Sequence, residues 1–509
     1  MVRLSAFGNR RDGYVKLDNY PGRELGDDKT WSVRGQLRLL PASNFTLDLA
    51  ADYSMSRSSG SPLVLLGTYP GSLAGTIYNT QRSGNPASCT TTAGQATNPA
   101  CFGPVRLPPD ARRSEALYLD RNLNQIDPDG RFETTGVSLT AEWELPFATI
   151  QSISAYRSLR ARYFGDSTPI GDLFWQTNLD PQNADQYSQE LQLSGTSLDD
   201  RLKWIVGAYY LHEKTFSRAE IVSVASLAPF VRAIYPVLAD NDQTIRTNNY
   251  AAFGQGTFDI TSWLHLTAGL RWTEEKKTSL LIIRPTTPDG LRGQLKVRRT
   301  SPLVSLSAEL TDNLFTYASY SKGFRSGGFP PRISGAVSSI PDYGPEEAES
   351  WEAGLKLTAL DNRLRTNIAV FTTNYRDFQA AGTRLDLVPP IPTTINAGDA
   401  RNRGVAVEIT AAPSRRFQVD VAGSYLDTEI TRSDPTLNDG GIPIPVGNRL
   451  PYAPSWKVTG GASWTVPVGE SGSLVLRSDV ALTSLIYFSL LNERAVAQPS
   501  MVLVKASGT

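Results

Sequence analysis

We predict an all-β chain that forms a transmembrane antiparallel up-and-down β-barrel, and three observations support this fold class. Apolar and polar residues alternate over runs of about 10–16 residues, whereas soluble strands average about 5–6 residues and a tilted bilayer-spanning strand needs about 9–11. Short turns alternate with long polar segments along the chain. No stretch approaches the roughly 18 consecutive apolar residues of a transmembrane helix, which leaves strands as the spanning elements.

The composition excludes several other classes. Fifty Lys and Arg residues balance 50 Asp and Glu residues among the 509 residues, and this zero net charge argues against a nucleic-acid-binding protein. Two His and two Cys are present, too few for the usual zinc, iron–sulfur and haem sites. His212 and His265 are predicted near opposite ends of their strands and so cannot share a metal. We expect no nucleic-acid partner, no metal site and no cofactor.

The alternation assigns two faces to the predicted strands at 44–54, 263–273, 351–358 and 416–425. Their apolar faces are Phe45, Leu47, Leu49, Ala51 and Tyr53; Leu264, Leu266, Ala268, Leu270 and Trp272; Trp351, Ala353, Leu355 and Leu357; and Phe417, Val419, Val421 and Tyr425. The opposite faces are polar or small, the pattern of a wall between lipid and a hydrated lumen. For lumen-facing polar residues we expect hydration and docking roles rather than ligand contact. They include Asp48, Asp52, Glu190, Gln192, Arg271, Glu352, Lys356, Glu408, Arg416 and Asp420.

The connections between strands follow a second regular pattern. Short turns are predicted at 41–43, 145–147, 196–201, 260–262, 311–313, 361–362, 412–415 and 467–471. Long polar segments separate them at 57–131, 165–183, 217–246, 322–347, 379–402 and 429–453. Outer-membrane barrels have short periplasmic turns and long extracellular loops. Counted in this way, the chain has about 18 strands.

Aromatic residues cluster near the predicted strand ends, where interfacial girdles are expected. They are Tyr53, Tyr163, Phe164, Tyr209, Tyr210, Tyr317, Tyr320, Phe324, Tyr375, Phe378, Tyr487 and Phe488. A large soluble β-protein would instead show shorter strands, connections of similar length and, in a propeller, a repeat of about 40–50 residues. The sequence shows no such repeat.

Several motifs carry a family resemblance. Residues 317–329 read Tyr-Ala-Ser-Tyr-Ser-Lys-Gly-Phe-Arg-Ser-Gly-Gly-Phe, and residues 344–356 read Gly-Pro-Glu-Glu-Ala-Glu-Ser-Trp-Glu-Ala-Gly-Leu-Lys. Further motifs lie at 367–379, 396–398, 404–408 and 450–454, with weaker ones at 11–14 and 188–193. In this order and spacing, nearly the whole chain resembles the β-barrel of TonB-dependent outer-membrane receptors.

This resemblance implies a fold, a location and partners. Family barrels have about 22 strands and an N-terminal plug domain that follows a TonB-contacting box. We expect residues 1–509 to be one barrel domain in the outer membrane, truncated at both ends and without the plug and the box. The implied function is TonB-energised uptake of a scarce bulky nutrient, most often a ferric siderophore, with cobalamin or an oligosaccharide as other ligand classes. The implied partners are outer-membrane lipid, the TonB system through the missing plug, and the ligand. We expect a monomer.

Alternative functions remain open at this point. A passive porin-like channel would need a closed barrel without a plug, and a truncated chain would be a non-functional receptor fragment. An enzyme would need a convergent catalytic set, and no Gly-x-Ser-x-Gly, P-loop or Gly-x-Gly-x-x-Gly motif is present. We therefore expect no enzymatic activity and no catalytic residue.

Six residues of the predicted outer loops are candidates for a local role. Cys89 and Cys101 lie in the same long segment, and an oxidising compartment would permit a disulfide between them. Two unpaired thiols are the alternative. Aromatic side chains can stack on a siderophore or a sugar, or can pack the loops. The aromatic candidates are Trp175, Tyr235, Phe329 and Tyr343.

Overall fold

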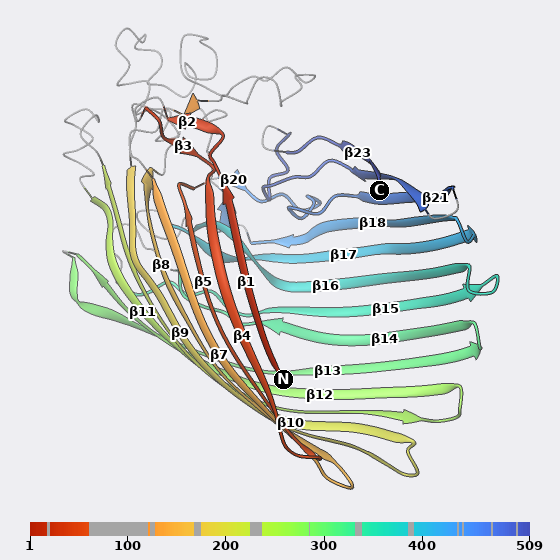
Figure 1. The fold of residues 1–509 in the computed structure, drawn as a ribbon. Coiled ribbons are helices and arrows are strands. Elements are labelled where there is room, and N and C mark those ends of the chain that lie inside the picture. The colour runs from red at the N-terminus through yellow and green to blue at the C-terminus, as the bar shows by residue number, and fades with distance from the viewer. Residues whose placement is uncertain are drawn as a thin grey trace.

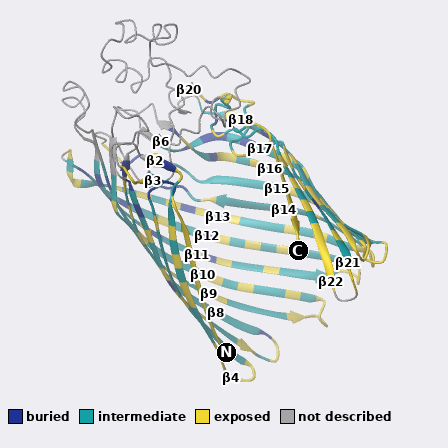
Figure 2. Cartoon of the chain, turned by 45° about the horizontal axis from the view of Figure 1, so that its top comes forward, coloured by how far each residue is buried: buried dark blue, intermediate teal, exposed yellow. Residues whose placement is uncertain are grey.

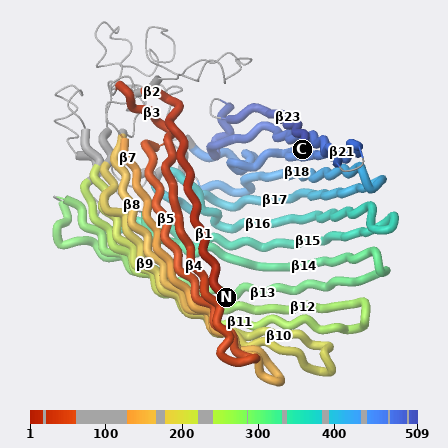
Figure 3. The backbone as a smooth tube through the Cα atoms, viewed as in Figure 1, coloured from red at the N-terminus to blue at the C-terminus, as the bar shows by residue number. Residues whose placement is uncertain are grey.

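The structure is a computed structural model, and one antiparallel sheet dominates it. The model describes residues 1–17, 21–60, 121–122, 128–166, 175–223, 237–284, 286–330, 338–384, 391–434, 437–439, 442–469, 472–494 and 497–509. Within these residues, 18 long strands form an up-and-down sheet that curls into a barrel wall (Figures 1 and 3). This confirms the predicted fold class and strand number.

The long strands follow one another around the wall in chain order. They are β1 (Val2–Arg11), β4 (Asp28–Ala42), β5 (Phe45–Ser58), β7 (Asp129–Glu144), β8 (Thr149–Asp166), β9 (Trp175–Ser197), β10 (Leu202–Ser223), β11 (Val237–Asp259), β12 (Leu264–Ile283), β13 (Thr287–Thr311), β14 (Leu314–Arg325), β15 (Glu346–Ala359), β16 (Leu364–Arg384), β17 (Ile391–Ser414), β18 (Phe417–Ser433), β21 (Trp456–Val468), β22 (Gly472–Thr483) and β23 (Met501–Gly508). Short strands β2 (Val15–Leu17), β3 (Glu24–Leu25), β6 (Arg121–Asn122), β19 (Leu437–Asp439) and β20 (Ile442–Pro443) lie in the connections.

Strands β1 and β23 are the two edges of this sheet. β1 pairs with β4 and β23 pairs with β22, and no ladder joins β1 to β23 among the described residues. Every residue of both strands is exposed. Within the described part of the chain, no helix is long and apolar enough to cross a membrane.

The two ends of the wall differ in the way the sequence predicts. All eight predicted short turns connect strands at one end, for example between β4 and β5 and between β7 and β8. At the opposite end, however, the predicted loops 165–183, 217–246 and 379–402 are largely strand. β9, β11, β13 and β17 have 23, 23, 25 and 24 residues, well beyond the roughly 9–11 that a bilayer requires.

The sequence did not reveal the outer parts of β9, β11 and β17 as strands, because polar residues are common on both of their faces. Above the bilayer a strand needs no apolar face, so the period-two alternation that marks a spanning strand disappears. Regular alternation of connection lengths also fails once, because β12 and β13 are joined at the outer end by residues 284–286 alone. The wall around β9–β13 therefore rises as an extended sheet rather than as loops (Figure 1).

The strand faces follow the predicted alternation. On β12, Leu270 and Trp272 are 55 % and 43 % exposed on the outer face, while Arg271 points to the lumen. At about 3.3 Å per residue the apolar run from Leu264 to Trp272 extends roughly 27 Å along the tilted strand. Figure 2 shows the same exposed positions repeating along the strands of the wall. The nine residues from Leu264 to Trp272 are about the length expected of a tilted strand that crosses the hydrocarbon layer.

Four aromatic pairs mark the outer edge of the apolar band. The ring centroids are 5.1 Å apart in Trp31–Tyr53, 5.0 Å in Tyr210–Tyr250, 4.6 Å in Tyr320–Trp351 and 4.7 Å in Tyr425–Trp456. In each pair the rings belong to neighbouring strands. Amphipathic rings at this level are typical of a membrane interface.

The girdle prediction was wrong for several aromatic residues, among them Tyr317, Tyr209 and Phe378. Tyr317 points into the lumen and donates a 2.6 Å hydrogen bond to Glu352, and the Tyr209 ring lies beneath Arg271. Phe378 is 7 % exposed and belongs to a packed cluster. Adjacent residues of a strand face opposite sides, so a Tyr-Tyr doublet such as 209–210 can supply one girdle residue only.

Leu49 and Ala50 allow a matched test of the two faces, because they are sequential residues in the middle of β5. We expect Leu49→Arg to destabilise the membrane-inserted protein by about 2–4 kcal/mol, since the guanidinium would face hydrocarbon. Ala50→Arg places the same side chain in the hydrated lumen and should cost far less. Urea unfolding in lipid vesicles measures both values, and equal losses would contradict the face assignment.

Candidate ligand-binding mouth

The connection between β14 and β15 folds against the lumen side of the wall at its outer end. Lys277 on β12 donates from Nζ to the Gly327 carbonyl oxygen at 2.8 Å and pairs with Glu275 at 3.1 Å. The Phe329 ring is 6 % exposed and packs with Leu281, Ile283 and Ile340. The connection is therefore held in place at the outer end of the barrel, the mouth, by one half-buried ion pair and one apolar cluster.

Two amides hold both ends of the same connection. Gln379 on β16 donates from Nε2 to the carbonyl oxygens of Ser326 and Gly344, both at 2.9 Å. Asn396 on β17 accepts from the Gly344 amide at 2.7 Å and donates to the Gly344 carbonyl at 3.0 Å. We call Gln379 and Asn396 the amide clasp. The clasp satisfies backbone groups that strand pairing leaves free.

Two glycines of the quoted motifs are explained by close backbone approach. A Cβ at Gly327 would lie 2.2 Å from the Tyr343 carbonyl oxygen, across the bridge that joins Gly328 to Tyr343. Gly398 has a φ of +139°, and a Cβ there would lie 1.8 Å from the Arg432 carbonyl oxygen. Both positions require glycine because any side chain would collide with backbone.

A second packed cluster holds the connections that follow β18 and β22. Its buried members are Phe378, Ile395, Ala397, Ala400, Ile430, Ile444 and Leu490, and Leu450 of the 450–454 motif packs against them. Asn448 donates to the Leu490 carbonyl at 2.8 Å, and Asn492 accepts from the Arg449 amide at 2.7 Å. Two connections far apart in the sequence are thereby fixed to the outer ends of β16–β18.

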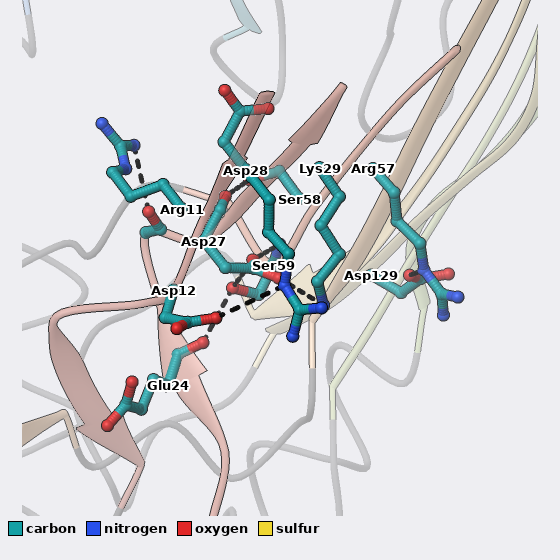
Figure 4. A network of polar contacts seen from close by, with 12 residues as sticks. Arg11, Asp12, Glu24, Asp27, Asp28, Lys29, Arg57, Ser58, Ser59 and Asp129 are labelled. Carbon is teal, nitrogen blue, oxygen red and sulfur yellow. Dashed lines mark hydrogen bonds and ion pairs between the residues drawn. The ribbon is translucent and has the colours of Figure 1, made fainter. Parts of the chain in front are cut away.

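A polar network holds the outer ends of β1, β4 and β5 (Figure 4). Arg11 of the 11–14 motif donates to the Gly26 carbonyl at 3.0 Å. The Asp27 carboxylate accepts from the Ser59 amide at 2.6 Å and from Ser59 Oγ at 2.5 Å, and Lys29 Nζ lies 3.3 Å away. The network ties residues that precede β4 to residues that follow β5.

The network changes the acidity of Asp27. Burial acts to raise the pKa of its carboxyl group, but the two hydrogen bonds from Ser59 and the charge of Lys29 outweigh burial and hold the pKa below the ordinary value of 3.8. At Tyr343, burial raises the pKa of the phenol, and the nearby positive charge of Arg325 opposes the rise.

The lumen wall below the mouth carries paired charges. Arg157 contacts Asp52 at 3.2 Å, and Arg477 contacts Asp420 and Asp479 at 3.3 Å and 2.6 Å. These pairs place the predicted lumen residues Asp52 and Asp420 on the lumen side. No group of three or more His, Cys, Asp or Glu side chains suited to a metal occurs in the described segments.

The structure places the aromatic candidates in different environments. Phe329 is packed inside the β14–β15 connection, which favours the packing alternative there, while Tyr343 is half-buried beside it. Trp175 begins β9, but its side chain lies outside the described residues, as do Tyr235, Cys89 and Cys101. Sequence analysis missed Lys277 and the anchoring role of Gln379 and Asn396. Gln379 and Asn396 lie within the motifs at 367–379 and 396–398, but the motifs alone did not indicate that these side chains anchor the β14–β15 connection.

The amide clasp yields a local stability prediction. Asn396→Ala removes three hydrogen bonds, which join Asn396 to the Gly344 amide, the Gly344 carbonyl and the Asp377 carbonyl. It should destabilise the connection locally by about 1–3 kcal/mol, because the Gly344 amide loses its partner. Hydrogen exchange at the Gly344 amide should accelerate accordingly. Asn367→Ala is the control, since Asn367 bonds Glu408 elsewhere on the wall at 3.1 Å. Unchanged exchange in Asn396→Ala would refute the clasp.

The Asp27 network predicts a dependence on pH. A carboxyl group with a depressed folded pKa stabilises the fold fully above its unfolded value near 3.8 and loses that contribution as the pH falls through the lower folded value. The protection factor of the Ser59 amide, which compares its exchange rate with the intrinsic rate at the same pH, should therefore fall on acidification below 3.8, and Asp27→Asn should remove this dependence. The exposed turn residue Asp312 supplies the control, and an equal effect of Asp312→Asn would contradict the assignment.

Comparisons with known proteins agree with this architecture. The family model described as "TonB dependent receptor-like, beta-barrel" matches residues 74–500. The metal-pseudopaline receptor CntO of Pseudomonas aeruginosa is 26 % identical over 137 residues, which are 27 % of this chain and 18 % of CntO. The probable TonB-dependent siderophore receptor PiuA of Acinetobacter baumannii is 28 % identical over 118 residues, 23 % of this chain and 15 % of PiuA. These matches span less than a fifth of each relative.

Solved structures share the fold over the whole chain. The ferric yersiniabactin uptake receptor FyuA of Yersinia pestis superposes with a TM-score of 0.74 at 17 % identity, covering 100 % of this chain and 67 % of FyuA. The siderophore receptor PiuA of Acinetobacter baumannii gives a TM-score of 0.70 at 16 % identity, covering 99 % of this chain and 70 % of PiuA. All these proteins are receptors and not enzymes. The wall, its faces and the family match together show that this chain belongs to the TonB-dependent receptor β-barrel family.

Proposed function

We propose that this chain is the barrel of an outer-membrane receptor for TonB-energised uptake of a scarce bulky nutrient, a ferric siderophore in the first instance. The proposal rests mainly on the arrangement of the β14–β15 connection at the outer end of the barrel. The motif residues anchor the β14–β15 connection on the lumen side, above a wall of paired charges.

The ligand class is supported by the chemistry of the mouth and by the relatives. Half-buried Tyr343 and exposed Arg325 lie at the β14–β15 connection, and the positive charge of Arg325 attracts an anionic chelate. Several relatives are named as siderophore receptors, among them PiuA and the ferric-pyoverdine receptor PbuA. The copper transporter OprC shares the fold at a TM-score of 0.64, so the fold itself does not choose the ligand.

In the proposed mechanism, uptake begins at the outer ends of the long strands. The outer extensions of β9–β13 and the anchored connections capture the ligand and remove it from bulk water. Those charged side chains of the lumen wall that are paired with one another form a hydrated surface. A plug can dock on this surface and move along it. TonB, acting through that plug, supplies the energy. We propose that the receptor works as a monomer surrounded by outer-membrane lipid.

A passive porin-like channel is the alternative, and uptake in intact cells separates the two. We expect accumulation of radiolabelled iron from a ferric siderophore to require both the receptor gene and a functional TonB system, because transport depends on energy from the inner membrane. A panel of siderophores, cobalamin and oligosaccharides identifies the ligand. Uptake that persists at the same rate without TonB would establish the passive channel instead.

A further inference from the structure

Three neighbouring strands are interrupted by β-bulges at the same height, near the outer end of the wall. On β16, Arg376 and Asp377 stand opposite the single residue Asp399 of β17. Ala397 on β17 and Thr431 on β18 are each left out of the ladder. An extra residue bends a strand and increases its twist, so aligned bulges bend the sheet along a line. We call the bulges at 376–377, 397 and 431 the bulge line.

The surroundings of β16 and β17 change at the bulge line. In the wall below, one face meets the lumen and the other meets the surroundings of the barrel. Beyond the bulges, the paired residues Ala380 and Ile395 pack with the apolar cluster of the connections that follow β18 and β22. The next pair, Gln379 and Asn396, binds the Gly344 backbone. Successive pairs face opposite sides of a sheet, so the outer ends of β16 and β17 form a layer between two connections.

One arginine locks the bulge line on its exposed side. Arg432 on β18 donates from Nε and Nη2 to the Asp399 carboxylate at 2.8 and 2.9 Å, and from Nη2 to Asp377 Oδ1 at 2.8 Å. Asp377 has a φ of +52°, a left-handed conformation that a non-glycine residue keeps only when its surroundings hold it. The Asp377 amide donates to Asp399 Oδ1 at 3.0 Å. Arg432 and Asp399 together supply the restraint through charge-assisted hydrogen bonds.

The Asp377 peptide is also bound to the amide clasp. Its carbonyl oxygen accepts from Asn396 Nδ2 at 2.8 Å, and Asn396 in turn holds both backbone groups of Gly344. Hydrogen bonds therefore run without a break from Arg432 through Asp377 and Asn396 to the β14–β15 connection. Because Asp377 bonds Arg432 at one end and Asn396 at the other, a change in its conformation displaces the clasp.

A second arginine on the same pair of strands provides the comparison. Arg403 on β17 donates from Nε to Asp427 on β18 at 2.7 Å. These two residues are directly opposite each other in the regular part of the ladder. The side chains of Arg403 and Arg432 are 57 % and 52 % exposed. Arg403 thus matches Arg432 in charge, exposure and strand pair, but its partner lies outside the bulge line.

We propose that Arg432 is a positioning residue of the ligand-binding mouth. By holding Asp377 in the left-handed conformation, Arg432 fixes the bend at the bulge line and with it the place of the amide clasp and of the β14–β15 connection. Arg432 acts through Asp377 and needs no contact with the ligand. The consequence for ligand capture rests on the proposed function, whereas the coupling between Arg432 and the clasp does not.

Hydrogen exchange of the purified full chain in detergent tests the coupling. We expect Arg432→Ala to accelerate exchange about tenfold at the Asp377 and Gly344 amides, the effect of one lost hydrogen bond between charged groups. Arg432→Lys keeps the charge but loses the planar fork that joins two carboxylates, so it should restore the protection only in part. Arg403→Ala is the matched control and should leave both amides unchanged.

Uptake of radiolabelled iron by cells that produce the receptor tests the consequence for ligand capture. The probes are ferric yersiniabactin and ferric pyoverdine, which the names of two relatives contain. We expect Arg432→Ala to raise the half-saturating concentration and to leave the maximal rate per receptor unchanged, because the mouth captures the ligand and does not drive transport. A variant that only folded less well would lower the maximal rate instead.

The outcomes separate the role of Arg432 from the proposed function. Faster exchange at Gly344 in Arg432→Ala, with an unaffected control, supports the positioning role. Faster exchange at Asp377 alone overturns it, because the bulge would then be locked without any coupling to the clasp. An equal effect of Arg403→Ala overturns it as well. An unchanged half-saturating concentration overturns the role in ligand capture, whereas wild-type cells that take up neither chelate contradict the proposed function and leave the exchange result as the test of the coupling.

Discussion

Backbone hydrogen bonding in an apolar environment is the constraint on which this structure depends. Inside a bilayer no water is available to satisfy peptide groups, so each strand must pair along its whole length. The antiparallel ladder from β1 to β23 meets this condition for every interior strand. Once the ladder is fixed, the register decides which side chain meets lipid and which meets the lumen. The aromatic pairs on the outer face and the paired charges of the lumen both follow from that register.

Above the bilayer the constraint is relaxed, and different interactions take over. Water can satisfy the backbone there, and the outer parts of β9, β11 and β17 are rich in polar residues, while the outer part of β12 packs Leu281 and Ile283 into an apolar cluster. Shape is maintained by anchors between distant segments: the amide clasp, the Lys277 contact, the Asp27 network and two apolar clusters. Each anchor joins connections to strands that are remote in sequence. The mouth is therefore an assembly of loops held by the wall, rather than a fold of its own.

The face of each strand residue could be predicted from the period-two alternation of the sequence. Contacts between residues far apart in the sequence could not. The outward position of Trp272 and the lumen position of Arg271 follow from alternation alone. Strand ends beyond the apolar band could not be located, because strands such as β11 continue where no apolar face is needed. Tyr209 and Tyr210 looked equivalent as aromatics near a strand end, and parity separates them. Gln379 was recognised as part of a motif, but its partners Ser326 and Gly344 lie far away in sequence, and no local pattern reports such a contact.

The amide clasp has an evolutionary consequence. Gln379 binds Ser326 and Gly344, the two ends of the same connection, so the clasp closes a ring in the chain. Insertions and replacements that spare the packed residues Phe329 and Ile340 therefore leave the register of β14 and β15 unchanged. The outer surface of this connection can therefore tolerate changes of sequence without a change in the transmembrane wall. The motif residues at 326–328, 344–346, 379 and 396 mark the boundary between these two parts of the chain.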